Sequence, residues 1–272
     1  PSISRMSTLP LLARRPPDTH MSSDSSGAAD GGKARGCCTL ALVAFYACVA
    51  LGFSVLLGST IKTHGLFPFK LDDASWGVAW LATTVVDYYV VAACMCGVVL
   101  ASESTLAGIV WCALFCLLGA PFGCAWVIYR MVSTGTLALA AARTHGAQPP
   151  AAVSQLGKDL IVAFYGVVGV AFSVRLSWTL YSFPLFPLQS DSAAWAAAWF
   201  WTTIGDFYSL TSCMCGIALF TEGAVMGLLW CSSFVLLGGP FFCAWTVFRL
   251  WTFGTLALSP NAAGPAYVIS NS

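Results

Sequence analysis

The chain contains a long internal repeat. Residues 45–139 align without a gap with residues 164–258, at a constant offset of 119 positions, and 44 of the 95 aligned positions are identical. A repeat of this length indicates that the chain is built from two copies of one structural unit. It also allows a comparison within the chain, because residues that both copies retain are candidates for a shared role.

The composition indicates that this unit is folded in lipid. Of the 272 residues, 58% are hydrophobic and only 8% are charged, and the mean hydropathy is +0.80. Soluble domains carry about 25% charged residues, so this chain has too few to coat a surface that faces water. A net charge of +1 gives no basis for binding nucleic acid, which needs a basic patch. The expected partner is the lipid bilayer.

Six apolar segments are each long enough to cross a bilayer, which takes roughly 20 predominantly apolar residues. They are continuous and do not alternate with period two, so helices are favoured over barrel strands. The sequence therefore predicts an all-α integral membrane protein with six transmembrane helices, arranged as two three-helix repeats. The predicted spans are residues 38–59, 76–100, 106–131, 160–180, 195–219 and 225–250.

Three spans in each copy is an odd number, so the second copy is predicted to enter the membrane from the opposite side. The two repeats would then have inverted topology, related by an axis in the membrane plane.

The N-terminal tail is rich in Ser, Pro, Gly and Arg, which is typical of either a disordered tail or an organelle-targeting segment. The predicted organisation is a tail (1–36), a first repeat (37–140), a linker (141–158), a second repeat (159–259) and a C-terminal tail (260–272).

Both copies retain an aspartate near the middle of their second span, Asp87 and Asp206. A carboxylate at bilayer depth costs about 2.5–3.5 kcal/mol, so it needs a partner, a proton or water. Threonines three and four residues earlier lie on the same helical face. The pattern predicts a site between the copies for an ion, a proton or a small polar solute; the alternative is a polar cluster that holds helices together. The threonines are Thr83 and Thr84, with Thr202 and Thr203 in the second copy.

Two arginines, Arg130 and Arg249, end the third span of each copy. We expect them to form structural ion pairs at the membrane interface with Asp72 and Asp191, which lie in the loops between the first and second spans. Arg175 differs, because it falls inside the fourth span and has no counterpart. An arginine within the membrane needs a partner, and Asp87 or Asp206 are the deep candidates.

Each third span also contains a proline, Pro121 or Pro240. A proline in mid-helix removes a backbone hydrogen bond and is predicted to kink the span. Broken helices line the binding sites of transporters, although kinks without such a role are also common.

No metal site, cofactor or catalytic group is expected. The Cys-Met-Cys-Gly motif at 94–97 recurs at 213–216, and its soft ligands would suit Cu(I), but residues two apart on a helix point away from each other. Most of the 12 cysteines are expected to be packing residues. The three histidines are neither clustered nor repeated, and no nucleophile with an adjacent base is visible, so an enzyme is not predicted.

One set of residues in the first copy forms a recognisable pattern: Trp76, the run Thr83-Thr84-Val85-Val86-Asp87-Tyr88-Tyr89, Glu103, Trp111, Gly119 and Cys124. In these residues the first copy resembles a plant and algal family of small multi-pass membrane proteins whose function is unknown. The resemblance would cover residues 45–258 as two tandem units and implies a photosynthetic eukaryote and an organelle membrane such as that of the chloroplast, but it assigns no site residue.

Two functions remain open from the sequence. The first is a small transporter or channel with its site between the repeats. The second is a non-catalytic accessory subunit of a photosynthetic or respiratory membrane complex, for which the high aromatic content and the absence of a large soluble domain argue.

Overall fold

A computed structural model describes residues 28–67, 75–140, 155–186 and 194–259. The chain divides into two compact units, Pro1–Cys37 and Cys38–Ser272. In the first unit, the described residues form the beginning of helix α1; the remainder of α1 and all other described elements belong to the second unit.

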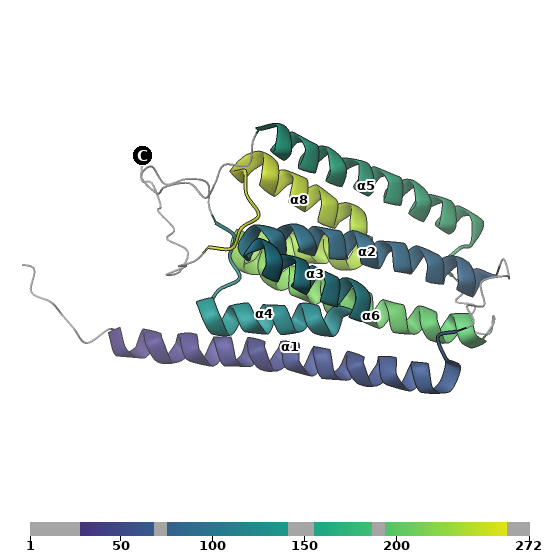
Figure 1. The fold of residues 1–272 in the computed structure, drawn as a ribbon, viewed down its shortest axis with the longest axis horizontal. Coiled ribbons are helices and arrows are strands. Elements are labelled where there is room, and N and C mark those ends of the chain that lie inside the picture. Colours follow the sequence, from purple (N-terminus) through teal and green to yellow (C-terminus); the bar gives the residue numbers. More distant parts are fainter. Residues whose placement is uncertain (1–27, 68–74, 141–154, 187–193, 260–272) are drawn as a thin grey trace, which may run out of the picture. The chain divides into compact units, whose positions relative to one another are not determined.

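The described residues are almost entirely α-helical (Figure 1). Each copy of the repeat forms two long helices followed by two short ones. In chain order they are α1 (Ala28–His64), α2 (Trp76–Ser102), α3 (Thr105–Leu118), α4 (Ala120–Thr134), α5 (Gln155–Ser182), α6 (Ala194–Glu222), α7 (Ala224–Leu237) and α8 (Gly239–Phe253).

Four helices are long and apolar enough to cross a membrane, and together they identify a polytopic membrane protein. The expectation of an all-α membrane fold is confirmed to this extent. The prediction of six spans is wrong, because the two remaining apolar segments are each divided into two helices of 14 and 15 residues. The four candidate spans are Thr39–His64, Trp76–Ser102, Leu156–Ser182 and Trp195–Glu222.

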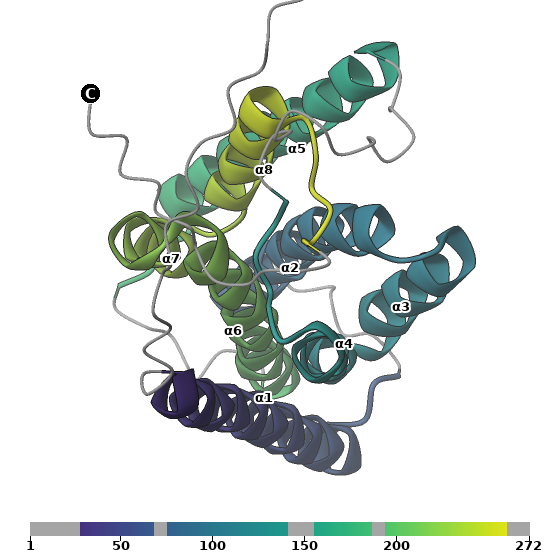
Figure 2. The ribbon, with the colours of Figure 1, turned by 90° about the vertical axis from the view of Figure 1, so that its left-hand side faces the viewer.

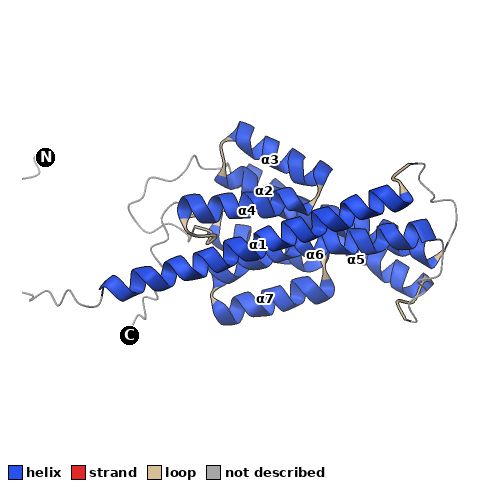
Figure 3. Cartoon of the chain, turned by 90° about the horizontal axis from the view of Figure 1, so that it is seen from below, coloured by secondary structure: helices blue, strands red, loops and turns tan. Residues whose placement is uncertain are grey.

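The two short helices of each copy form a hairpin. Glu103 lies in the turn between α2 and α3, and Arg130 lies near the end of α4, yet their side chains are 3.5 Å apart. In the middle of the hairpin, the Trp111 and Tyr129 rings stack with centroids 6.2 Å apart. The chain therefore turns back between α3 and α4, which lie beside each other in Figure 3, and returns to the end of the bundle where α3 began. Helices α7 and α8 repeat this with Glu222 and Arg249, whose side chains are 3.4 Å apart.

Equivalent helices of the two copies run in the same direction. The indole N–H groups of Trp76 and Trp195, at the starts of α2 and α6, donate to the backbone carbonyls of Pro184 and Gly65, just after α5 and α1. These tryptophans belong to one hydrophobic cluster, so all four helix ends meet at one end of the bundle. The predicted inverted topology is therefore wrong. Its premise was three spans per copy, whereas each copy has two helices long enough to span the membrane and a hairpin that returns to the end of the bundle where it began.

Each copy packs its first helix against the second helix of the other copy. Helix α1 contacts α6 through Thr60 and Thr202, whose hydroxyl oxygens are 2.7 Å apart, and α5 contacts α2 through Thr179 and Thr83 at 2.8 Å. Near the other end of the bundle, the Tyr46 and Tyr165 hydroxyls donate to the carbonyls of Ser212 and Ala93. All of these contacts join residues of different copies, so neither copy has a separate core.

Helices α2 and α6 lie at the centre of the second unit, as the end view in Figure 2 shows. Both helices bury apolar and sulfur-containing side chains in the shared core, including Cys94 and Met95 of α2 and Cys213 and Met214 of α6, which are all fully buried. Just beyond the hairpins, the backbones of Leu139 and Leu258, which are equivalent residues, form an isolated antiparallel bridge. This bridge ties the ends of the two copies together.

Candidate functional site

The break between the two helices of each hairpin is made by a glycine and followed by a proline. Gly119 has φ 92° and Gly238 has φ 67°, backbone conformations that other residues rarely adopt. Pro121 and Pro240 occupy the first turn of α4 and α8, where a missing N–H breaks no helical hydrogen bond. The predicted proline kink is therefore wrong. The prolines start a new helix, and the glycines reverse the chain.

A carboxylate from the other copy caps each of these helix starts. The backbone N–H of Ala120, the first residue of α4, donates to Asp206 Oδ1 of α6 at 2.6 Å. The backbone N–H of Gly239, the first residue of α8, donates to Asp87 Oδ1 of α2 at 2.7 Å. A helix N-terminus presents free N–H groups and a partial positive charge, so it stabilises a carboxylate placed there. The two aspartates thus make reciprocal bonds between the copies.

The carboxylates lie directly over the reversal glycines. A Cβ atom at Gly238 would be 2.6 Å from Asp87 Oδ2, and one at Gly119 would be 3.0 Å from Asp206 Oδ1. Any side chain at these positions would push the carboxylate off the helix start. Two independent reasons therefore require glycine at positions 119 and 238: the positive φ of the backbone and the close approach of the aspartate carboxylate.

The four threonines predicted to support the aspartates do not bond to them. Thr83 and Thr202 donate within their own helices and pair with Thr179 and Thr60. The other two, Thr84 and Thr203, donate to the carbonyl four residues earlier. The carbonyl four residues earlier is within reach of a threonine hydroxyl in a helix, so the hydroxyl can form a hydrogen bond without a partner on another helix. The expected support of the aspartates by threonine hydroxyls is therefore not formed, and a role of the threonines in binding a solute stays a prediction.

The arginine prediction is half right. Arg130 and Arg249 do form ion pairs, but with Glu103 and Glu222 of their own hairpins. Because the chain reverses at the glycine, the arginine at the end of each hairpin lies beside the glutamate at its beginning. A single continuous span would have placed these two residues at opposite ends of the helix. The indole N–H of Trp126 donates to Glu103 at 2.9 Å, and that of Trp245 donates to Glu222 at 3.1 Å. The expected partners Asp72 and Asp191 lie outside the described residues.

Arg175 is exposed on α5 and makes no ion pair within the part of the chain that the structure describes. Neither aspartate is its partner, because each bonds to a helix start instead. An arginine about seven residues from the end of its helix can extend its guanidinium along the stem toward the membrane surface.

Cysteines from different copies meet beside the caps. The sulfur atoms of Cys94 and Cys243 are 3.9 Å apart, and those of Cys124 and Cys213 are 3.6 Å apart. Among the described residues, no group of three or more potential ligands could hold a metal ion. Gly216 of the repeated motif lies against the Tyr46 hydroxyl, so at this position the motif allows close packing of α1 on α6.

The site is thus a pair of carboxylates, each half-buried, with one oxygen held by a helix N-terminus. The remaining lone pairs can accept a proton or a cation. Because Pro121 has no N–H and the N–H of Phe122 donates to Gly119, the helix start offers few further donors to an anion.

Sequence reasoning identified both aspartates but missed their partners. The sequence signal that indicates the helix starts is Gly-Ala-Pro at 119–121 and Gly-Gly-Pro at 238–240, because this pattern ends one helix and begins another.

No protein-family model, curated protein or solved structure matches this chain.

Proposed function

We propose that this polytopic membrane protein is a small transporter or channel for a proton, a cation or another small polar solute, with Asp87 and Asp206 as its binding groups. The observation that carries the proposal is the reciprocal capping of the two hairpins. Each ionisable carboxylate holds the N-terminus of a short helix that begins inside the bundle. Discontinuous helices of this kind surround the substrate and ion sites of many transporters.

The arrangement couples ion occupancy to the position of a hairpin. A charged carboxylate binds a backbone N–H about twice as strongly as a neutral group does, and it is stabilised further by the helix dipole. A proton or a bound cation takes up that negative charge and weakens the bond to Ala120 or Gly239. The hairpin tip is then free to move away from α6 or α2, and it returns when the carboxylate loses its ion.

The route for the ion is at the hairpin tips. The seam between α2 and α6 is filled with fully buried side chains such as Val91, Met95, Leu210 and Met214. An ion passing along this seam would have to displace close-packed groups. Asp87 and Asp206 lie to either side of the seam, each facing the hairpin of the other copy.

Flux measurements on proteoliposomes test this proposal. Asparagine can still accept the backbone N–H bond of the helix start but cannot ionise. We therefore expect Asp87→Asn and Asp206→Asn to remain folded, with melting temperatures between those of the wild type and the alanine variants, and to reduce flux to the level of empty vesicles. Thr84→Val is the matched control, since Thr84 bonds only within α2. Wild-type vesicles that pass no proton or cation faster than empty ones, or full flux in both asparagine variants, would overturn the proposal.

A second candidate is an accessory subunit of a photosynthetic or respiratory membrane complex. It is favoured by the completeness of the caps, because each aspartate already has a structural role that explains its presence. The resemblance to a plant and algal family supports an organelle membrane for either candidate. Native gel electrophoresis of mildly solubilised membranes distinguishes them: an accessory subunit migrates with a large complex, whereas an independent transporter migrates near its own mass.

A further inference from the structure

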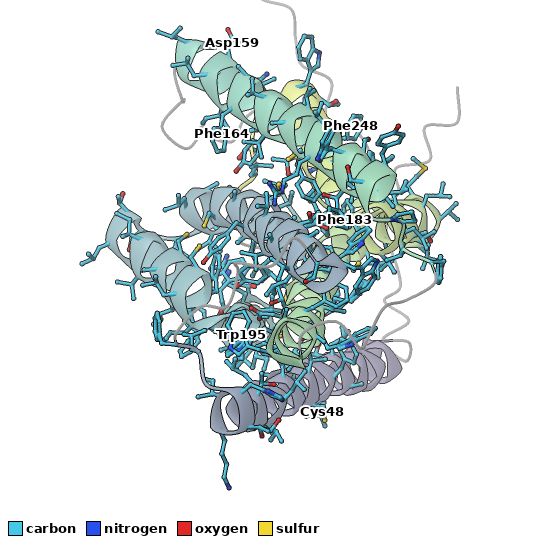
Figure 4. All side chains as sticks on the ribbon, turned by 90° about the vertical axis from the view of Figure 1, so that its right-hand side faces the viewer. Cys48, Asp159, Phe164, Phe183, Trp195 and Phe248 are labelled. Carbon is cyan, nitrogen blue, oxygen red and sulfur yellow. The ribbon has the colours of Figure 1, made fainter. Side chains whose placement is uncertain are left out.

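A groove of about 760 Å³ lies on one side of the bundle, and neither Asp87 nor Asp206 is among the residues that line it. Its walls come from α2, α3, α5 and the end of α8, so it joins the two copies. The lining is mostly aliphatic and aromatic, and Phe164, labelled on α5 in Figure 4, is part of it. Along α2 the groove extends from Tyr89 to Ala101, which is roughly 18 Å at the rise of an α-helix.

A positively charged side chain, that of Lys158, lies at the end of the groove. Lys158 is in the first turn of α5, and its ammonium group donates to the carbonyl of Trp251 at 3.4 Å. An ammonium group has three donors, so this long bond leaves others available. Asp159, the next residue, projects about 100° further around the helix. The glutamates at this end of the bundle, Glu103 and Glu222, are engaged with arginines.

The corresponding residues of the other copy lack both features. The position of Lys158 is occupied by Thr39, and the position of Ala101 is occupied by Phe220. A phenyl ring in place of the Ala101 methyl group would project into the groove. The open groove beside Ala101 and the positive charge of Lys158 therefore occur together on one side of the bundle. The equivalent side lacks both, although the two copies are otherwise closely similar.

We propose that this groove binds an anionic phospholipid, with one acyl chain along α2 and α5 and the phosphate at Lys158. The groove is apolar along its length and basic at the helix end, which is the distribution of polarity in such a lipid. Basic pockets at the ends of transmembrane helices bind anionic head groups in this way. The surrounding bilayer supplies the lipid, so no separate delivery step is needed.

Native mass spectrometry of delipidated protein, titrated with phosphatidylglycerol and with phosphatidylcholine of the same acyl chains, tests the assignment. We expect phosphatidylglycerol to bind more tightly. Lys158→Ala should weaken its binding about five-fold and leave phosphatidylcholine unchanged, since one lysine near a membrane surface contributes about that factor. Lys62→Ala is the matched control, because Lys62 is an exposed lysine at the far end of α1.

Blocking the groove provides the second arm. Ala101→Phe, which copies the residue of the other repeat, should weaken binding of both phospholipids. Ile161→Trp obstructs the same groove from the exposed side of α5 and serves if Ala101→Phe fails to fold. Equal binding of the two phospholipids to the wild type, an equal effect of Lys62→Ala, or undiminished binding in a folded blocked variant would overturn the proposal. Displacement of phosphatidylglycerol by equimolar oleate would also overturn it, by identifying a free fatty acid as the occupant.

Discussion

Asp87 on α2 holds the first backbone N–H of α8, at Gly239, through a hydrogen bond of 2.7 Å. Asp206 on α6 makes the equivalent bond to Ala120 of α4 at 2.6 Å. These two bonds relate the central helices of each copy to the hairpin of the other. They explain how a carboxylate and a free helix start, each costly in an apolar interior, are stabilised together.

The first prediction concerns the caps. Asp87→Ala removes the acceptor for Gly239 and should destabilise the protein by about 1–2 kcal/mol, as loss of a helix cap does. Asp87→Asn should cost less than Asp87→Ala, because the neutral amide oxygen can still accept the bond, although more weakly than the carboxylate. Unfolding in detergent, followed by circular dichroism, measures both. Val86→Ala, at the exposed neighbouring position, is the control; equal stability of the alanine and asparagine variants at Asp87 would show that the cap contributes nothing.

The second prediction concerns the reversal glycines. Gly238→Ala forces a side chain into a conformation open mainly to glycine and pushes on the Asp87 carboxylate, so a loss of at least about 1–3 kcal/mol is expected. Gly52→Ala is the comparison, because nothing lies within 4 Å of a Cβ built at this helical glycine. That change should be neutral or stabilising. The two alanine variants can be compared in the same unfolding experiment, and similar melting temperatures would contradict the interpretation.

The third prediction concerns the ion pair at the base of the second hairpin. Arg249 is only 3% exposed, and Glu222 is its ion-pair partner at 3.4 Å. Glu222→Ala leaves a buried charge unpaired and should cost about 3–5 kcal/mol. Replacing both residues, as in Glu222→Leu with Arg249→Met, should recover much of this loss. A double-mutant cycle gives the coupling energy, which a merely incidental pair would leave near zero.

The fourth prediction concerns topology. Cysteines introduced at Ser104 and Ser133, at the two ends of the first hairpin, should react with a membrane-impermeant maleimide from the same side. Cysteines at the equivalent positions Thr63 and Ser182 should both react from the other side. Mass shifts relative to the wild type exclude the native cysteines. A single third span would put Ser104 and Ser133 on opposite sides, and inverted repeats would separate Thr63 from Ser182.

Much of the architecture was predictable. The offset of 119 residues located the two copies, and it also located Asp87 and Asp206, because a carboxylate kept twice in an apolar segment needs a partner in each copy. What could not be predicted was the identity of that partner. Backbone N–H groups have no side-chain signature, so the search among polar side chains led to Thr83 and Thr202, which bond elsewhere.

The sequence by itself determined that this chain is a helical, lipid-embedded duplication with an acid in each central helix. Hydrophobic content and repeat spacing are properties of the chain, and they hold in any fold the chain adopts. The tertiary structure decided that the third apolar segment folds back on itself, because the reversal at Gly119 is stabilised only when Asp206 of the other copy reaches Ala120. It also decided that the copies run parallel. Both outcomes depend on contacts between residues 86 or more positions apart, which local pattern does not specify.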